Sequence, residues 1–519
     1  MRKLITTSIL FILATLAYAQ QGTLDVSFST DGKLATLLTT GNCAARSVAV
    51  QPDAKIIAAG YARNTNTSND FSLMRFNTDG TPDTNFNATG KAFVDFGGLD
   101  DLCTGIGLQS NGKIIAGGFI DTSNGFGFGL TRLNVDGTLD TTFGTNGKTV
   151  IEPGITSFCS ALAIQSDDKI LLAGHTLSPF TQNNEFVVSR FNADGSIDQD
   201  FGTNGFTRTA VGSGSSVANG MTLQPDGKLI LVGQTANNAT LRWETALVRY
   251  NTDGSLDGFF GDNGQIITAL PLLDGILESA AVQPDGKIVV AGYAGTSPTN
   301  NQSLLLRFLS DGTPDLGFAN NGQLVTLAGA NNNMIQSVLL QGENIVVAGS
   351  STQNGGDRFL LAAFDSDGNP DTAFGNNGAT LTHFADHDGI NAMALAPDGK
   401  LVTAGVSYDN NVAHFALARY HTSTSLGLRE NHPSDWGLAV YPNPLRQDSR
   451  LRFVLEANQT VSADWYDALG RKMTSVLSCE NRLKGTHEKT LGFVDALPSG
   501  TYYLVFSTPE ASTTLKLVK

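Results

Sequence analysis

The sequence is poor in features on which many functions depend. Of its 519 residues only four are cysteine, seven are histidine and three are tryptophan, and charged residues make up 16%. Basic residues are outnumbered, with 33 Lys and Arg against 48 Asp and Glu, which gives a net charge of -15. Nucleic acid and anionic membranes both require a basic surface, so we expect neither as a partner. G-x-S-x-G, P-loop and Rossmann fingerprints are also missing.

Long apolar runs are confined to the N-terminus. Arg2 and Lys3 precede an apolar stretch from Leu4 to Leu16, and Ala17-Tyr18-Ala19 is an A-x-A cleavage pattern before Gln20. This pattern predicts a signal peptide over residues 1–19, cut between Ala19 and Gln20. We therefore expect an exported mature chain with no transmembrane span, because nothing else approaches 18 consecutive apolar residues.

One phrase is present seven times. A pattern close to R-F-N-x-D-G-x-x-D-x-x-F-x-x-x-G-K, followed by Q-P-D-G-K-I-x-x-A-G, returns about every 58 residues. Its second aspartate stands at Asp25, Asp83, Asp140, Asp198, Asp257, Asp315 and Asp371. A period of this length is typical of a solenoid or a propeller, because one unit cannot bury its own apolar face.

Each repeat predicts four antiparallel strands. In one copy the strands are expected at 90–96, 104–109, 114–118 and 126–134. The turn Ser110-Asn111-Gly112-Lys113 joins two of them, and N-G or D-G between apolar runs is a strong hairpin signal. Four antiparallel strands make one propeller blade, and a β-solenoid, the alternative, would not repeat a hairpin turn.

The predicted fold is all-β, a seven-bladed β-propeller over residues 20–421. The expected four-stranded units are 32–77, 90–134, 147–192, 205–251, 264–309, 322–365 and 378–421. The chain starts on the connector Leu24–Phe28 and the repeats end on a fourth strand, Ala416–Tyr420. We expect these two segments to lie side by side and close the ring, in a monomer.

Residues present in every unit are interpreted as architecture. Six arginines open the R-F-N phrase and should pair with the repeated aspartates, whereas the sixth unit has Ala363 instead. The connector phenylalanines should pack between blades. The N-x-D-G-x-x-D loops, such as Asn251/Asp253/Asp257, resemble half of a calcium loop, but Asx-turns explain the same residues. We therefore expect no cofactor, with calcium as the alternative.

Function is expected where the copies differ. The D-G hairpins and connectors lie on one face of the disc, and the loops between the first and second and the third and fourth strands lie on the other. These loops vary and are rich in Asn, Thr and Ser. A ligand site is predicted there or at the mouth of the central channel, with four candidate aromatic contacts: Tyr61, Phe180, Trp243 and Tyr293.

Catalytic signals are few. The one histidine cluster offers His383 and His387 as weak metal-ligand candidates, but the helical face that H-x-x-x-H usually exploits is missing. We expect no enzyme; the alternative is a glycan hydrolase or lyase that uses the loop carboxylates Asp70, Glu185, Glu244 or Asp386.

The cysteines Cys103 and Cys159 occupy equivalent places in adjacent repeats. They form either a disulfide between neighbouring units or two buried thiols.

The repeat phrases at 190–205 and 223–233 resemble the delta-60 repeat of secreted bacterial proteins. The resemblance covers about 400 residues. It implies a β-propeller, and it carries no general activity.

After a polar linker, 422–436, residues 437–519 resemble the type A C-terminal sorting domain of the type IX secretion system of the Bacteroidota. The matching residues include Pro442, Asn443, Pro444, Asp467, Gly470, Arg471, Gly500, Tyr502, Lys516 and Lys519. The strand pattern at 450–455, 461–467, 489–493, 501–507 and 512–518 predicts a small immunoglobulin-like β-sandwich. The resemblance implies passage through the periplasm and export by the type IX machinery, followed by release or attachment to the cell surface.

The function expected is a secreted or surface-held module that binds a glycan or a protein, or alternatively a purely structural surface protein.

Overall fold

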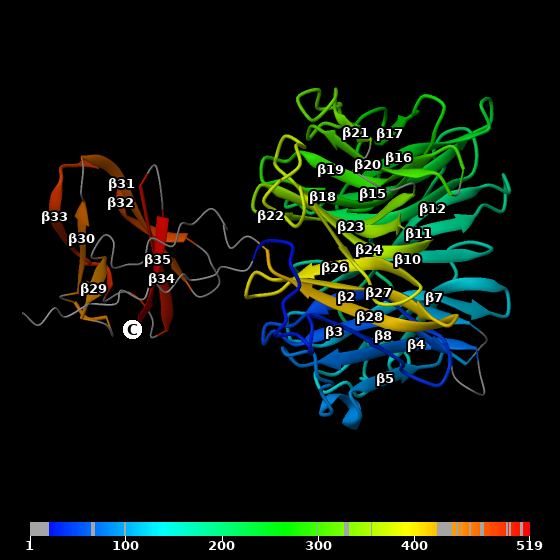
Figure 1. Cartoon of the computed structure of the whole chain (residues 1–519), viewed down its shortest axis with the longest axis horizontal. Helices are drawn as coiled ribbons and strands as arrows, with labels where there is room; N and C mark the ends of the chain where they lie inside the picture. The colour runs from blue at the N-terminus through cyan, green and yellow to red at the C-terminus, as the bar shows by residue number, and fades with distance from the viewer. Residues whose placement is uncertain are drawn as a thin grey trace, which may run out of the picture. The chain divides into compact units, whose positions relative to one another are not determined.

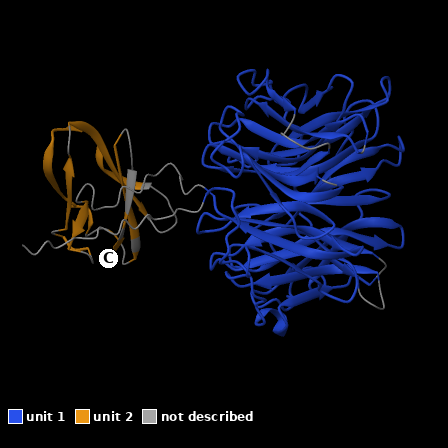
Figure 2. Ribbon diagram, viewed as in Figure 1, with its two compact units in different colours: residues 1–422 blue, residues 423–519 orange. Residues whose placement is uncertain are grey.

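The computed structural model describes residues 20–63, 68–97, 100–297, 299–325, 332–353, 355–422, 438–442, 445–447, 449–455, 458–467, 472–494, 497, 500–508 and 512–519. The chain forms two compact units, residues 1–422 and 423–519 (Figure 2). Within the described part of the chain, no helix has the length and apolar character to cross a membrane. The predicted signal peptide and most of the predicted linker lie outside the described residues.

The larger unit is a ring of seven antiparallel sheets, each with four strands (Figure 1). Blades one to three are β2 (Cys43–Val50), β3 (Ile56–Arg63), β4 (Asn69–Phe76) and β5 (Lys91–Val94); β6 (Asp101–Leu108), β7 (Ile114–Thr122), β8 (Gly125–Leu133) and β9 (Lys148–Ile151); β10 (Ser157–Ile164), β11 (Ile170–Leu177), β12 (Asn184–Phe191) and β13 (Phe206–Thr209). A one-turn 3-10 helix, η1 (Phe86–Ala88), lies between β4 and β5.

Blades four to seven continue this order around the ring. They are β14 (Ser216–Leu223), β15 (Leu229–Asn237), β16 (Arg242–Tyr250) and β17 (Gln265–Thr268); β18 (Asp274–Val282), β19 (Ile288–Gly295), β20 (Asn301–Phe308) and β21 (Gln323–Val325); β22 (Asn333–Gln341), β23 (Asn344–Gln353), β24 (Gly356–Phe364) and β25 (Ala379–Thr382); β26 (His387–Leu395), β27 (Leu401–Asp409), β28 (Val412–Tyr420) and β1 (Lys33–Thr36). The predicted seven-bladed propeller is confirmed.

The blade boundaries differ from the predicted units by one strand. The units were expected to start at the short strand after each connector, but that strand pairs with the preceding three; β5, for example, completes blade one. A periodic sequence fixes the strands but not the boundary between sheets. The predicted closure holds, because β1 pairs with β28 and the connector residue Leu24 bridges Tyr420.

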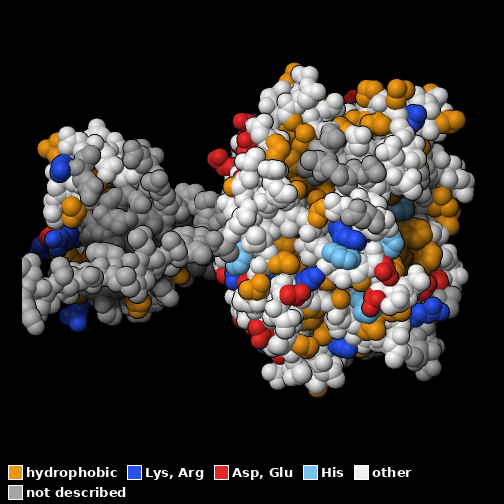
Figure 3. Space-filling model, viewed as in Figure 1, with side chains coloured by type: hydrophobic (Ala, Val, Ile, Leu, Met, Phe, Trp, Pro, Cys, Tyr) orange, Lys and Arg blue, Asp and Glu red, His pale blue; other side chains and the backbone are white. Residues whose placement is uncertain are grey.

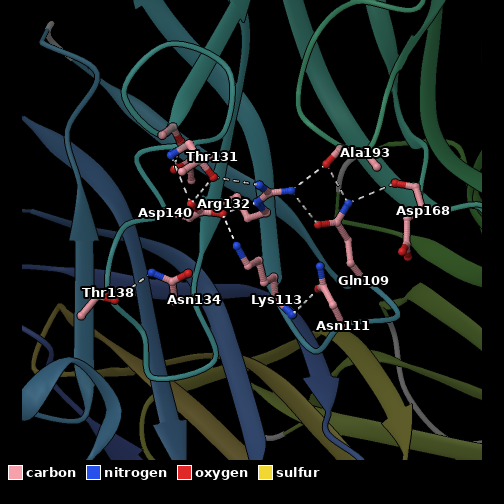
Figure 4. Close-up of polar contacts among 12 residues, drawn as sticks. Gln109, Asn111, Lys113, Thr131, Arg132, Asn134, Thr138, Asp140, Asp168 and Ala193 are labelled. Atoms are coloured by element: carbon pink, nitrogen blue, oxygen red, sulfur yellow. Dashed lines mark hydrogen bonds and ion pairs between the residues drawn. The ribbon is translucent and has the colours of Figure 1, made fainter.

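An arginine–aspartate–lysine cluster repeats at the junctions between blades. In blade two, Arg132 Nε lies 2.6 Å and Lys113 Nζ 2.7 Å from Asp140 Oδ2 (Figure 4). Arg132 also donates to the carbonyl of Ala193 in the next blade at 2.7 Å. The predicted arginine pairs are all present, at 2.6–2.8 Å: Arg75–Asp83, Arg132–Asp140, Arg190–Asp198, Arg249–Asp257, Arg307–Asp315 and Arg419–Asp25.

The connector phenylalanine completes each cluster. Each arginine lies over the phenylalanine that follows its aspartate, with 4.2–5.1 Å between the guanidinium carbon and the ring centroid. The ring packs against a turn glycine of the next blade. At Gly195, whose φ is +86°, an added Cβ would lie 2.6 Å from the ring of Phe143. The prediction that these rings pack between blades is confirmed.

Blade six lacks both cations of the cluster. Ala363 replaces the arginine and Asn344 replaces the lysine. The remaining carboxylate, Asp371, is only half-buried and still accepts the backbone N–H of Ala373 at 3.1 Å. The two cations have been lost together, as expected if both serve to balance one buried charge.

The N-x-D-G loops use their oxygens in turns. Asp253 Oδ1 accepts the backbone N–H of Ser255 at 2.9 Å and its hydroxyl at 2.6 Å, while the second aspartate, Asp257, is held by Arg249 and Lys228. This is the Asx-turn arrangement.

The smaller unit contains two antiparallel sheets around one core. The sheets are β29 (Ala439–Tyr441), β30 (Arg450–Leu455) and β33 (Gly485–Thr490); and β32 (Lys472–Arg482), β31 (Gln459–Asp467), β34 (Thr501–Ser507) and β35 (Ser512–Val518). Phe453 and Trp465 belong to the shared core. Strand β32 was not predicted, and β33 ends at Thr490 rather than at residue 493. The immunoglobulin-like connectivity stays a prediction.

We predict that Asp257→Asn destabilises the propeller by about 3–5 kcal/mol, because it leaves the buried Arg249 and the half-buried Lys228 without their anion. Asp371→Asn in blade six, where neither cation is present, is the matched control and should change stability by less than about 0.5 kcal/mol. Urea unfolding of the full chain measures both. Equal effects of the two substitutions would show that the ion cluster does not stabilise the fold.

Candidate functional site

Each innermost strand carries a β-bulge at one place. The register of the ladder between the first and second strands shifts there in all seven blades. The repeated glycine of the A-G phrase lies opposite the bulge and allows the two backbones to approach closely. At Gly292 an added Cβ would lie 2.0 Å from the carbonyl oxygen of Ile276. The glycine is therefore required by the bulge, and a bulge re-aims the side chain that it carries.

The bulged residues form a ring around the central channel, which we call the inner ring. Its members differ from blade to blade: Arg46, Thr104, Ser160, Asn219, Glu278, Gln336 and Asn391. Some also join neighbouring blades, as Asn391 donates to the carbonyl of Ala45 at 2.7 Å and Thr104 to that of Cys159 at 3.0 Å. The scaffold thus holds six different types of side chain at seven equivalent positions, with asparagine at two of them.

A second set of variable residues follows the repeated glycine on the second strand of each blade, and we call it the outer ring. Its members are Tyr61, Phe119, His175, Gln234, Tyr293, Ser350 and Val406, all half-buried. The two rings contact each other within a blade. Asn219 donates to Gln234 at 2.8 Å, and the guanidinium of Arg46 lies 5.9 Å from the ring centroid of Tyr61.

The channel encloses a cavity of about 580 Å3. All seven inner-ring residues line it, together with Phe119, Phe158, His175 and serines at 47, 279 and 337. Phe119 and Phe158 contact each other at 5.3 Å between ring centroids, and Phe158 stacks on His175. The cavity therefore combines amides, hydroxyls and an aromatic wall with one arginine and one glutamate.

The charges in the cavity depend on burial. Desolvation raises the pKa of Glu278 to about 8 against the opposing effects of its hydrogen bond with Tyr293 and of Arg46. Desolvation lowers the pKa of His175 to about 4. At pH 7 the glutamate is mostly protonated and the histidine neutral, so Arg46 supplies the net charge. On the side of the propeller that Figure 3 shows, acidic and basic side chains are interspersed on the surface.

The predicted aromatic residues lie in different places. Tyr61 and Tyr293 belong to the outer ring, and each contacts a charged residue of the inner ring. Phe180 is 86% exposed in the β11–β12 loop. Trp243, on β16, is half-buried and its backbone N–H donates to Asp274 at 3.0 Å. None of the four predicted aromatic residues lines the cavity. The inner ring was missed, although variation at one fixed distance before the repeated glycine could have indicated it.

The predicted alternative carboxylates do not converge in the channel. Asp70, Glu185 and Glu244 occupy equivalent positions on the third strands of three blades, and Asp386 is exposed before β26. None of the four lines the cavity.

The histidine pair and the cysteines have separate partners. His383 Nδ1 lies 3.2 Å from Asp388, and His387 Nδ1 lies 3.2 Å from Asp357, so each ring faces a different carboxylate. Cys103 and Cys159 are buried free thiols, the second of the two alternatives considered.

The predicted sorting residues are only partly described. Tyr502 is buried against Trp465 at 6.2 Å between rings, and the Lys519 and Gly500 backbones exchange two hydrogen bonds of 2.9 Å. Pro442 follows a cis peptide bond. Asn443, Pro444, Gly470 and Arg471, and the side chains of Asp467 and Lys516, lie outside the described residues.

We predict that Glu278→Gln stabilises the protein at high pH. Because the folded pKa exceeds the ordinary value, the wild type loses stability as pH rises from about 4.5 to about 8. The variant should gain on the order of 1–3 kcal/mol at pH 9, with the gain shrinking toward pH 5. Thermal unfolding across pH measures this, with the exposed Glu343→Gln as control. A difference in stability between variant and wild type that does not change with pH would contradict the raised pKa of Glu278.

Several solved structures resemble the chain, and no curated protein matches it. PorZ of Porphyromonas gingivalis, a surface component of the type IX secretion system, is 13% identical with a TM-score of 0.36, covering 91% of this chain. This chain spans 58% of the PorZ chain. A Dyadobacter fermentans protein of unknown function is 10% identical, with a TM-score of 0.43 and coverage of 75% and 98%. A PL25 ulvan lyase is also 10% identical, with a TM-score of 0.44 and coverage of 75% and 96%. None of these similarities assigns an activity to the chain.

Two family models match the sequence. The β-propeller domain of unknown function DUF5122 matches at 51–86, 109–143, 165–201, 224–259, 283–318, 344–374 and 396–426. A secretion system C-terminal sorting domain matches at 439–519, and this domain indicates secretion or attachment at the cell surface. The chain is a DUF5122 β-propeller protein that carries a C-terminal sorting domain of the type IX secretion system.

Proposed function

We propose that the protein is a non-catalytic binding module that takes an acidic oligosaccharide at the variable face and the channel behind it. The observation that carries this proposal is the inner ring, whose seven equivalent positions all line the cavity and vary in side chain while the surrounding scaffold repeats. Variation among residues that line a cavity is typical of recognition on a rigid scaffold.

The chemistry of the cavity favours a sugar ligand. Asn219, Gln336 and Asn391 offer amide donors and acceptors, and the hydroxyls of Thr104 and Ser160 offer both. The Phe119 and Phe158 rings provide an apolar wall on which the face of a sugar ring can pack. A volume of about 580 Å3 lies within the range of small-ligand sites.

The charge of the cavity favours an acidic sugar. Arg46 is charged at all relevant pH values and Glu278 is mostly neutral at pH 7, so the cavity attracts a carboxylate or sulfate group. Ionisation of Glu278 above about pH 8 would cancel this attraction. The same single carboxylate supports binding over hydrolysis, because hydrolysis of a glycoside commonly needs two carboxyl groups across the cleft.

A glycan array probed with the chain from residue 20 to 519 tests the proposal. Acidic glycans should bind near neutral pH and weaken above pH 8. Arg46→Ala should lower their affinity by at least about tenfold, since a charge-assisted hydrogen bond contributes about 1.5–3 kcal/mol. Phe259→Ala, a change at a 92% exposed side chain on the opposite face, is the matched control.

Two results would contradict the proposal. Binding that is unaffected by Arg46→Ala would place the ligand elsewhere. New reducing ends or unsaturated products on prolonged incubation with a bound glycan would favour the lyase or hydrolase alternative.

Export is predicted to depend on the sorting domain. Deletion of residues 437–519 should leave the propeller in the periplasm of a host that carries the type IX system. Immunoblots of periplasm, cell surface and medium measure this, with Phe259→Ala as a full-length control that should be exported normally. Recovery of the truncated propeller in the medium would contradict the role of the domain.

A further inference from the structure

Three carboxylates gather at the variable face where blade one meets blade two. Asp70 lies near the start of β4, Asp95 follows β5, and Asp101 opens β6, the inner strand of the next blade. One oxygen of each carboxylate lies within 4.8 Å of the other two. Asp70 and Asp101 are buried, at 4% and 0% exposure, and Asp95 is exposed, so the cluster is accessible to solvent from one side.

Asp101 has a carboxylate oxygen without a donor. Its Oδ2 accepts the backbone N–H of Phe96 at 2.7 Å, while Oδ1 is buried and has no hydrogen-bond partner among the residues that the structure describes. The nearby N–H of Asp121 donates to the carbonyl of Asp100 at 3.0 Å. A buried anionic oxygen left unpaired is costly, so this one requires a positive partner or a proton.

The junction between blades six and seven provides an internal comparison. Asp388 occupies the position of Asp101, and its Oδ1 accepts the hydroxyl of Ser407 at 2.7 Å. The residue opposite Asp101 is Ile120, which has no hydroxyl to donate. In blade seven, Ser407 thus donates to Asp388 Oδ1, whereas the equivalent oxygen in blade two, Asp101 Oδ1, has no such donor.

The neighbours from the preceding blade are basic residues at one junction and acidic residues at the other. The ladder positions of Asp70 and Asp95 in blade one correspond to Arg358 and His383 in blade six. His383 Nδ1 lies 3.2 Å from Asp388. One buried aspartate is therefore paired with a histidine of this chain, whereas Asp101 meets two further acids.

The basic residue Lys148 on β9 of blade two does not fill the gap. Lys148 donates to the backbone carbonyl of Asp95, not to a carboxylate, and lies 5.3 Å from the ring centroid of Phe96. Desolvation, with contributions from Asp95 and Asp70, raises the pKa of Asp101 to about 6, so this buried carboxylate is mostly ionised in neutral solution.

We propose that Asp70, Asp95 and Asp101 bind a calcium ion that joins blades one and two at the variable face. Oxygens up to 4.8 Å apart can share one ion at the 2.3–2.6 Å typical of calcium ligands. Magnesium demands near-octahedral geometry at about 2.0–2.1 Å and usually keeps several waters with one or two carboxylates, so a set of three protein carboxylates suits calcium better. Water molecules can supply the remaining ligands through the exposed side at Asp95.

Calorimetric titration of the EDTA-treated chain, residues 20–519, with calcium chloride near neutral pH tests the proposal. The wild type should bind calcium and unfold at a higher temperature in its presence. Asp95→Asn changes an exposed side chain and should bind one calcium ion fewer per chain, or bind it at least about tenfold more weakly. Asp101→Asn should behave in the same way, and Asp95→Asn keeps the test decisive if Asp101→Asn does not fold.

Asp253→Asn, in a repeated Asx-turn, is the matched control and should bind as many calcium ions as the wild type. Three results would overturn the proposal: no calcium binding by the wild type, wild-type binding by both Asp95→Asn and Asp101→Asn, or magnesium bound as tightly as calcium. The first of these would indicate that Asp101 is held protonated instead.

Discussion

The buried carboxylate at each junction is the constraint on which the propeller depends. Asp257 Oδ2 accepts Arg249 and Lys228, while Oδ1 caps the connector turn by accepting the N–H of Phe259 at 3.2 Å. The same arginine donates to the carbonyl of Ser310 in the next blade and covers the ring of Phe260. Asp257 therefore fixes the connector turn directly and, through Arg249, also holds the ring of Phe260 and the neighbouring blade. Such a network is stable only when every member is satisfied, which explains why blade six has lost both cations rather than one.

A second constraint, the glycine opposite each bulge, connects architecture to function. The glycine allows the inner strand to bulge, and the bulge turns a residue that is free to vary into the channel. Because the glycine repeats in every blade, the inner-ring residue opposite it can differ from blade to blade. The repeat phrase therefore predicts where the inner-ring residue of each blade lies, but not which side chain stands there. Arg46, Asn219 and Glu278, for example, occupy equivalent positions.

Much of the fold could be predicted from the sequence because its signals are local. The hairpin turns, the aspartate–arginine spacing and the position of the first connector indicated seven blades, their ion pairs and the closure of the ring. The blade boundary could not be predicted, since the sequence leaves β5 free to pair with either neighbouring sheet. The predicted ligand contacts Tyr61 and Tyr293 stay predictions. Their neighbours Arg46 and Glu278 were not predicted, because both lie on a bulge that no residue pattern in the sequence indicates.

The junctions show how a repeated scaffold can hold unlike sites. The backbone places Asp101 and Asp388 in equivalent buried positions, so their different environments come from a few side chains of the preceding blade and the strand opposite. His383 and Ser407 satisfy one aspartate, while Asp70, Asp95 and Ile120 leave the other with excess negative charge. In the channel, likewise, Arg46 and Glu278 stand at equivalent positions in blades one and five. Because each junction and each blade can change its charge without disturbing the ion clusters on the opposite face, the variable face can acquire ligand and cation sites independently.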